Sequence, residues 1–259
     1  MSQNTIFRWQ ADALTPTDDD ATSTPIEVAD SWLVSEGRTL AIGLHRERFL
    51  LGIESRGFPH LLQAAEAFWD AALATIPRDG DWFPRVELRS GAGNPELVLR
   101  LRTAPARTDS VVVATFAGED PRSEPTIKGP DLEVLAAARA SVAPAGEAVL
   151  LTADAFVVEG AYSGLLWWRG KILCGPLSEF ERIDSVTVRS VLALAAALGI
   201  ETFDEAVTPS ELDGVELWSL SALHGPRIVT RWIDGPGLAE LPGRLKMWRA
   251  RLGALRQPL

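Results

Sequence analysis

Three segments of the chain place apolar residues three or four positions apart, the spacing that gathers side chains on one face of a helix. They span residues 59–76, 185–199 and 241–255. The second is the best specified, because Ser185 suits an N-cap and Gly199 suits a C-terminal stop. An alanine-rich stretch over residues 131–142, begun by Pro130, predicts one further helix.

Between these helices the chain carries short apolar or alternating runs bounded by turn residues, the pattern of β-strands. A hairpin is predicted over residues 26–34 and 39–44, with Ser35-Glu36-Gly37 at its turn. Antiparallel strands are predicted over residues 82–88, 96–102 and 110–116. Further strands are predicted over residues 148–151, 156–159, 164–168, 171–174, 216–221 and 227–233. This mixture of helices and strands predicts an α+β (mixed α/β) fold.

The strongest break in composition lies at residues 118–125, where prolines and charged residues disfavour helix and sheet interiors. A chain of 259 residues is also longer than most single domains. We therefore predict an N-terminal α/β domain over residues 1–117, a linker over residues 118–126 and a C-terminal α/β domain over residues 127–259.

Charge and composition narrow the classes of function. The 35 acidic residues outnumber the 25 basic ones, and the net charge of −10 disfavours binding to nucleic acid or to anionic membranes. Residues 1–10 show no basic region followed by an apolar run, and no apolar stretch is long enough for a membrane span, so we expect neither a signal peptide nor a transmembrane helix. Cys174 is the only cysteine, which suits a reducing compartment. We expect a cytoplasmic protein.

The sequence lacks the common motifs of hydrolases and metalloenzymes. Gly91-Ala92-Gly93 lacks the third glycine of a dinucleotide fingerprint and predicts a turn. The three histidines are isolated, so no metal site is expected. Two candidates remain. Lys128 lies in a loop before Gly129 and Pro130, and Glu159 ends a very apolar strand.

The order and spacing of these candidates resemble the class IV aminotransferase family, the fold-type IV enzymes that use pyridoxal 5′-phosphate (PLP). That family has a lysine at the start of a loop and helix, followed later by a Val-x-Glu-Gly strand end. Here the matching residues are Lys128 and Glu159, which lie 31 positions apart (159 − 128 = 31). Glu159 is followed by Gly160, as in the family.

Other segments resemble the family in the same order. Ser185-Val186-Thr187-Val188 and Leu198-Gly199-Ile200 resemble the two ends of a helix that the family opens with Gly-Ile-Thr-Arg. Residues 216–223 resemble the strand and loop that follow, and residues 45–49 (His-Arg-Glu-Arg-Phe) resemble an upstream His-x-x-Arg-Leu segment. The resemblance implies a two-domain fold like that of D-amino-acid aminotransferase, with the active site between the domains, and a homodimer.

The resemblance also implies roles for the matching residues. Lys128 is expected to form the internal aldimine with PLP and to transfer a proton as a general base, which requires a neutral amine. Glu159 is expected to face the pyridine nitrogen and keep it protonated. Arg48 is the candidate for the phosphate, with Arg46 or a surface salt bridge as the competing interpretations. Further cofactor contacts are expected from Val186, Thr187, Ser221 and Ala222.

For the substrate carboxylate, the sequence offers Arg85 and Arg89, which share one face of a predicted strand with Glu87. A solvated strand face explains the same residues. Tyr162 and His224 are further candidates for the substrate pocket. The family implies an amino acid and a 2-oxo acid as substrates, with transamination as the reaction and aminodeoxychorismate lyase as the alternative.

Four positions depart from the family pattern. Gly164 stands where the family usually has asparagine, Ser185 where it has glycine, and Val188 where it has arginine. Ala222 lacks the hydroxyl that aminotransferases often have at its position. These departures leave the substrate open, and they keep a non-catalytic PLP-binding protein as a second alternative.

Overall fold

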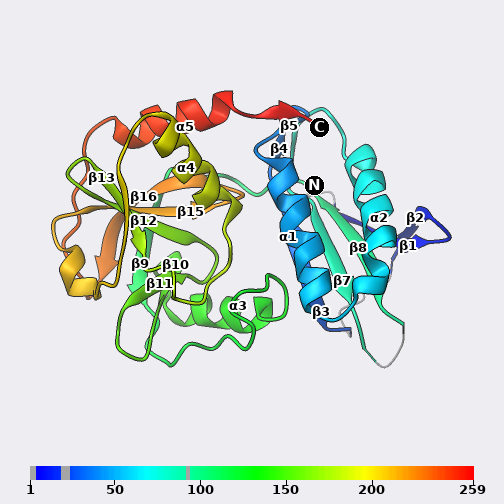
Figure 1. The fold of residues 1–259 in the computed structure, drawn as a ribbon, viewed down its shortest axis with the longest axis horizontal. Coiled ribbons are helices and arrows are strands. Elements are labelled where there is room, and N and C mark those ends of the chain that lie inside the picture. Colours follow the sequence, from blue (N-terminus) through cyan, green and yellow to red (C-terminus); the bar gives the residue numbers. More distant parts are fainter. Residues whose placement is uncertain (1–3, 19–23, 92–93) are drawn as a thin grey trace. The chain divides into compact units, whose positions relative to one another are not determined.

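The computed structural model describes residues 4–18, 24–91 and 94–259, and its contacts divide the chain into two units (Figure 1). Unit 1 contains Met1–Ala106, Ile127–Pro130 and Leu255–Leu259. Unit 2 contains Arg107–Thr126 and Asp131–Ala254. A short central segment and the last residues of the chain therefore belong with the N-terminal part.

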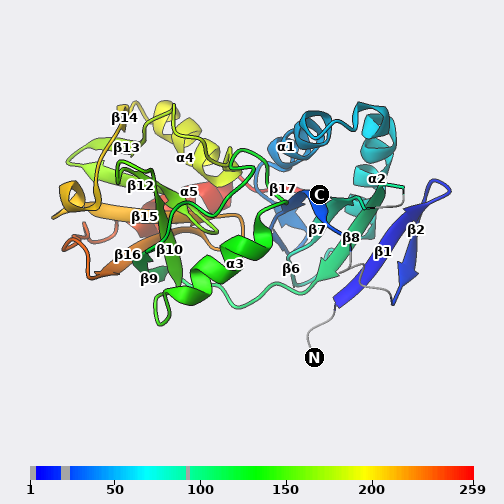
Figure 2. The ribbon, with the colours of Figure 1, turned by 90° about the horizontal axis from the view of Figure 1, so that it is seen from below.

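Unit 1 is built on an antiparallel sheet with the strand order β2-β1-β8-β7-β3. Its strands are β1 (Asn4–Gln10), β2 (Ala13–Thr17), β3 (Ile26–Ser31), β7 (Arg85–Arg89) and β8 (Glu96–Arg102). Helices α1 (Ile42–Ser55) and α2 (Leu62–Thr75) cover one face of this sheet (Figure 2). A 3-10 turn, η1 (Pro59–Leu61), precedes α2.

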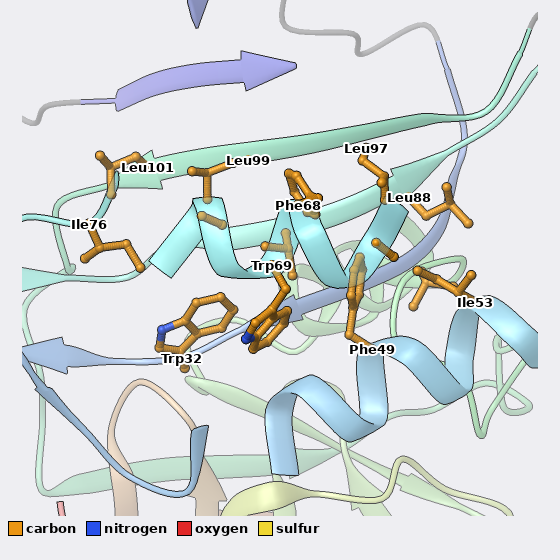
Figure 3. Packing of buried hydrophobic residues seen from close by; sticks show 14 of the residues in the cluster. Trp32, Phe49, Ile53, Phe68, Trp69, Ile76, Leu88, Leu97, Leu99 and Leu101 are labelled. Carbon is orange, nitrogen blue, oxygen red and sulfur yellow. The ribbon is translucent and has the colours of Figure 1, made fainter. Parts of the chain in front are cut away.

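Aromatic side chains fill the space between the helices and the sheet of unit 1. Trp32, Phe49, Phe68 and Trp69 are buried there (Figure 3), and the ring centres of Trp32 and Trp69 lie 4.8 Å apart. Helix α1 approaches β3 closely at Gly52, where a Cβ atom would stand 2.6 Å from Val28 Cγ1. This packing fixes α1 against β3.

A small sheet with the order β17-β5-β4-β6 completes unit 1. Its strands are β4 (Val34–Ser35), β5 (Arg38–Thr39), β6 (Asp81–Trp82) and β17 (Gln257–Pro258). Because β17 pairs with β5, the last residues of the chain belong to this unit.

Unit 2 contains a mixed sheet with the order β11-β10-β9-β16-β15-β12-β13-β14. Strand β9 pairs in parallel with β10 and β16, β13 pairs in parallel with β14, and the other neighbours are antiparallel. The strands are β9 (Ser110–Thr115), β10 (Glu147–Leu151), β11 (Val157–Gly160), β12 (Gly164–Arg169), β13 (Ile172–Pro176), β14 (Thr202–Glu205), β15 (Glu216–Ser221) and β16 (Gly225–Ile233). Its helices are α3 (Leu132–Ser141), α4 (Val186–Ala197), η2 (Pro209–Leu212) and α5 (Arg244–Ala254).

Both faces of this larger sheet are apolar. Where α4 and α5 pack on one face, Trp168, Trp218 and Trp248 meet edge to face, with ring centres 5.5 to 5.6 Å apart. The opposite face buries a second cluster that includes Trp167 and Leu217. Burial on both sides explains why the strands of unit 2 are apolar runs rather than alternating ones.

The mixed α/β class and the four predicted helices are confirmed, the helices as α2, α3, α4 and α5. The predicted N-cap of α4 is confirmed as well, because the Val188 amide donates to Ser185 Oγ at 3.3 Å. Gly199 follows the end of α4 with φ of +65°, the left-handed conformation expected of a C-terminal glycine.

The predicted hairpin is shorter than expected, and its second strand is wrong. Pairing is limited to Val34 with Thr39 and Ser35 with Arg38, and α1 occupies the chain from Ile42 onward. The apolar pattern of α1 is interrupted because its buried face includes a histidine and a glycine. Strands β1 and β2 were not predicted, since their residues are largely half-buried or exposed and only half of them are apolar.

The antiparallel prediction for residues 110–116 is also wrong. This segment, β9, joins the sheet of unit 2, where its neighbours β10 and β16 run parallel to it. The chain therefore enters unit 2 at Arg107, before the predicted linker over residues 118–126, and residues 127–130 return to unit 1. Residues 92 and 93 of the predicted turn lie outside the described residues. Among the described residues, no helix is long and apolar enough to cross a membrane.

Candidate active site

The backbone around Lys128 is docked on the edge strand of unit 1. The Ala29 amide of β3 donates to the Lys128 carbonyl at 2.6 Å. Gly129 adopts φ of +144°, and a Cβ atom there would stand 2.8 Å from both Ala29 N and Val28 Cα. Ile127 packs against the apolar core of unit 1. Lys128 is therefore held by β3, rather than by the C-terminal part in which the predicted domain division includes it.

A buried charged cluster lies next to this segment on β3 and α1. Asp30 accepts from Arg48 Nε and from an Arg48 terminal nitrogen, each at 2.8 Å, and its Oδ1 lies 2.7 Å from His45 Nδ1. Burial alone raises the pKa of Asp30, but the charge of Arg48 and the hydrogen bonds from His45 and Arg48 hold it far below its usual range. Asp30 is therefore ionised at neutral pH.

His45 is neutral in this cluster. Burial lowers the pKa of His45; Asp30 opposes that shift, and the charges of Arg48 and Lys128 reinforce it. Because an ionised carboxylate only accepts hydrogen bonds, His45 donates its Nδ1–H to Asp30. Because the charges of Lys128 and Arg48 both act on His45, the predicted catalytic lysine lies near the same buried cluster as Arg48.

The structure separates Arg48 from its competitor Arg46. Arg46 lies 3.5 Å from Asp70 and 3.9 Å from Glu66, both on α2, so it forms the kind of surface salt bridge weighed for this segment. Arg48 is mostly buried, and Asp30 orients its guanidinium through two parallel hydrogen bonds. Of the two arginines, only Arg48 is held rigidly.

Glu159 is buried in unit 2 at the end of β11, where its residue is 5% exposed. It does not face solvent. Its Oε1 accepts from an Arg122 terminal nitrogen and from the Ile183 amide at 3.3 Å. Burial alone lowers the pKa of Arg122, but Asp120 and Glu159 raise it above its ordinary value. The sequence analysis missed Arg122, because nothing local indicates that it meets a carboxylate 37 residues later.

The first turn of α4 combines the features of an anion site. Val186 and Thr187 are buried, and the turn, which is fully described, contains no acidic side chain. The first amides of a helix lack partners within it, and the helix dipole favours negative charge there. Gly164 lies against this turn of α4 and pairs with Leu220 near the end of β15. Ser221, the next residue of β15, therefore lies at the same end of the sheet as the first turn of α4. Ser221 Oγ accepts from the His224 amide at 3.3 Å, and Ala222 lies between them in the turn before β16.

Two of the departures from the family pattern contact each other. A Cβ atom on Gly164 would stand 2.5 Å from Val188 Cγ2. Val188 therefore fills the space that a larger residue at position 164 would need. The glycine and the valine form one packing unit beneath the first turn of α4.

Arg85 and Arg89 share a face with Glu87, as expected, but this face is buried rather than solvated. Glu87 is fully buried and accepts from both arginines at 2.5 Å and from Arg100 at 2.9 Å. Burial opposes its ionisation, yet these guanidinium groups hold the pKa of Glu87 below its usual range. Burial, with Arg85 and Arg100 nearby, lowers the pKa of Arg102 to about 10. The cluster has more cationic than anionic groups.

Tyr162 and His224 have partners within unit 2. The Tyr162 hydroxyl donates to the Leu132 carbonyl at 3.5 Å, and His224 Nδ1 accepts from the Thr108 amide at 3.2 Å. Burial, together with the charges of Arg227, Arg139, Arg249 and Arg107, lowers the pKa of His224 to about 4. The His224 imidazole is therefore neutral at pH 7.

Comparison with protein families gives one match over most of the chain. The model for amino-transferase class IV matches residues 27–232. No curated protein sequence matches the chain.

Solved structures share the fold of this protein over nearly the whole chain. A fold IV-transaminase from Curtobacterium pusillum is 18% identical, with a TM-score of 0.79 and 97% of each chain covered. A branched-chain aminotransferase from Thermoproteus uzoniensis is 16% identical, with a TM-score of 0.80, and the match covers 97% of this chain and 95% of that one. A hypothetical aminotransferase from Mycobacterium tuberculosis in a PLP-bound form is 17% identical, with a TM-score of 0.76 and 98% of each chain covered. The expected fold-type IV architecture is confirmed.

The contact between Gly164 and Val188 predicts a specific rescue. Gly164→Ala forces a Cβ atom against Val188, and we expect the free energy of unfolding to fall by about 1–3 kcal/mol. Val188→Ala in the same background is expected to recover part of that loss, because it removes the clashing methyl group. Urea denaturation followed by tryptophan fluorescence measures both variants.

Gly253→Ala is the matched control, since it lies in α5 and no described atom outside its own helix and chain neighbours stands within 4 Å of the added Cβ. Full stability of the single Gly164→Ala variant, or equal losses with and without Val188→Ala, would contradict the packing described.

Proposed function

The chain belongs to the class IV aminotransferase family, and from that membership we propose that it transfers an amino group between an amino acid and a 2-oxo acid. Enzymes of this family use PLP. The observation that carries the proposal is the docking of the Lys128 segment on β3 beside the buried Asp30, His45 and Arg48 cluster. Such a lysine, fixed by its backbone next to an oriented arginine, suits attachment of a phosphate-bearing cofactor.

The residues present fit the chemical groups of PLP. We propose that Arg48, the Val186 and Thr187 amides, the Thr187 hydroxyl and the turn at Ser221 and Ala222 bind the phosphate. The orienting bonds from Asp30 and the acid-free first turn of α4 support these assignments. Glu159 is proposed to face the ring nitrogen, and its burial without exposure to solvent supports that role.

The proposed chemistry divides between the cofactor and Lys128. PLP, when bound, supplies an electron sink for the negative charge that develops at the substrate Cα. Lys128 Nζ removes and returns the Cα proton as a general base, a role that only the neutral amine can perform. The fixed backbone at Gly129 limits where Nζ can reach, which suits a base that must act at defined atoms.

For the substrate carboxylate we propose the buried cluster around Glu87. Three guanidinium groups share this one carboxylate, so Arg85 and Arg89 keep excess positive charge that an anionic substrate group can neutralise. Tyr162 and His224 receive less support, because each has a hydrogen-bond partner within unit 2. By the same family resemblance we propose a homodimer, and Cys174, buried and reduced, is consistent with a cytoplasmic location.

The alternative reaction is that of aminodeoxychorismate lyase. Ala222 offers no hydroxyl where aminotransferases often carry one, and this single feature of the phosphate turn favours the lyase. A non-catalytic PLP-binding protein is the second alternative, favoured by the Gly164 and Val188 departures.

The first test is the identity of the lysine that carries the cofactor. We expect borohydride reduction of the PLP-loaded protein to leave a pyridoxyl group on Lys128, and Lys128→Ala to abolish the visible absorbance of the bound cofactor. Lys171→Arg and Lys246→Arg are matched controls, since the sequence contains only these two other lysines. Peptide mapping that locates the label on either of them would contradict the assignment.

The second test distinguishes the reactions. We expect an amino acid and a 2-oxo acid, supplied together, to exchange their amino group, with no turnover when the 2-oxo acid is omitted. Chromatographic analysis of the amino acids formed measures this exchange. Release of pyruvate from aminodeoxychorismate without any 2-oxo acid would establish the lyase, and stoichiometric PLP with neither reaction would favour the non-catalytic alternative.

A further inference from the structure

Arg122 joins the cofactor-facing acid to the segment that precedes Lys128. Its side chain is 3% exposed. One terminal nitrogen donates to Glu159 Oε1, while the other donates to Asp120 Oδ2 at 2.5 Å and to the Glu181 carbonyl at 3.2 Å. Nε donates to both Asp120 oxygens, at 2.8 and 3.1 Å. The guanidinium is thus fixed with one edge on Asp120 and one corner on Glu159.

From this geometry we propose that Arg122 is a positioning residue, which keeps Glu159 ionised so that the proton shared with the cofactor's ring nitrogen stays on that nitrogen. The inference rests on the proposed function, because it requires bound PLP.

The charges around Glu159 explain why a cation is needed. The Glu159 side chain is 7% exposed, and burial favours the neutral form of a carboxyl group. Arg122 is a cation in direct contact with it, the Ile183 amide adds one hydrogen bond, and Asp120 and Asp131 place negative charge near Arg122. Arg122 therefore brings positive charge against a buried carboxylate, which offsets the cost of burying it in its ionised form.

The location of the shared proton follows from elementary electrostatics. When the shared proton is on the ring nitrogen, the pair formed by Glu159 and that nitrogen is ionic, and its negative end is Glu159. When the proton is on Glu159, the same pair is neutral. A cation that touches the negative end stabilises the ionic form more than it repels the more distant positive end. Arg122 touches Glu159 itself, so it favours the protonated ring, which is the form that withdraws electrons.

Asp120 has a different role in this arrangement. It accepts three hydrogen bonds from the Arg122 side chain and one from the Arg122 amide, and its side chain is 30% exposed. It therefore orients the guanidinium that also contacts Glu159. Arg182 differs from Arg122 in its partners, because it donates to the backbone carbonyls of Leu177, Phe180 and Pro176. Its contribution is structural.

The test is nitrogen NMR of the protein loaded with PLP that carries ¹⁵N in its ring, referenced to free PLP at acidic and alkaline pH. We expect a pyridinium resonance in the wild type, in Arg122→Lys, and in the matched control Arg182→Gln. Arg122→Gln is expected to move the resonance to the position of neutral pyridine. A pyridinium resonance in folded, PLP-loaded Arg122→Gln would overturn the inference while leaving the proposed function intact.

A second measurement covers the case in which Arg122→Gln fails to retain PLP. In the cofactor-free protein at neutral pH, infrared difference spectra between Arg122→Gln and Arg122→Gln/Glu159→Gln are expected to contain the carbonyl band of a protonated carboxyl group. The same comparison between wild type and Glu159→Gln is expected to lack it. An ionised Glu159 in Arg122→Gln overturns the inference, and a wild type that binds no PLP overturns both the inference and the proposed function.

Discussion

The close approach of Gly129 to strand β3 is the constraint on which the placement of Lys128 depends. The backbone atoms of Val28 and Ala29 occupy the space that any side chain at position 129 would need, and the Ala29 amide binds the Lys128 carbonyl. The next residue of the same strand is Asp30, which orients Arg48 and His45. One edge strand thus fixes both the lysine proposed to be catalytic and the arginine proposed for the phosphate.

Buried carboxylates organise the polar parts of both units. Asp30, Glu87 and Glu159 are each buried, and each is paired with at least one arginine. Removing a carboxylate from water is unfavourable unless charge and hydrogen bonds compensate for the loss of solvation. The guanidinium groups supply that compensation, and their planar geometry fixes orientation as well. A protein with a net charge of −10 therefore concentrates arginine around the groups that its proposed chemistry uses.

The sequence predicted those parts of the structure whose signals are local. Helix α4 was predictable because its apolar period, its Ser185 cap and its terminal glycine all lie within one segment. Lys128 and Glu159 were proposed as site residues from their neighbours in the chain, and the structure shows that Glu159 is buried. Helix α1 was missed because its buried face includes His45, whose partner Asp30 lies in another element. Arg122 was missed for the same reason, because its partner Glu159 lies 37 residues later in the chain and meets it only in the folded protein.

If β3 positions Lys128 through Gly129, a side chain at position 129 should disturb the presentation of that lysine, and Gly129→Ala adds such a side chain. Labelling of Lys128 by PLP and borohydride, quantified by mass spectrometry, measures whether the lysine is still presented correctly. We expect tryptophan fluorescence to stay native while labelling falls by about tenfold or more, equivalent to about 1.4 kcal/mol. The control Gly43→Ala, in α1 with no described atom outside its own helix and chain neighbours within 4 Å of the added Cβ, is expected to label like the wild type. Wild-type labelling of Gly129→Ala would show that Gly129 does not position Lys128.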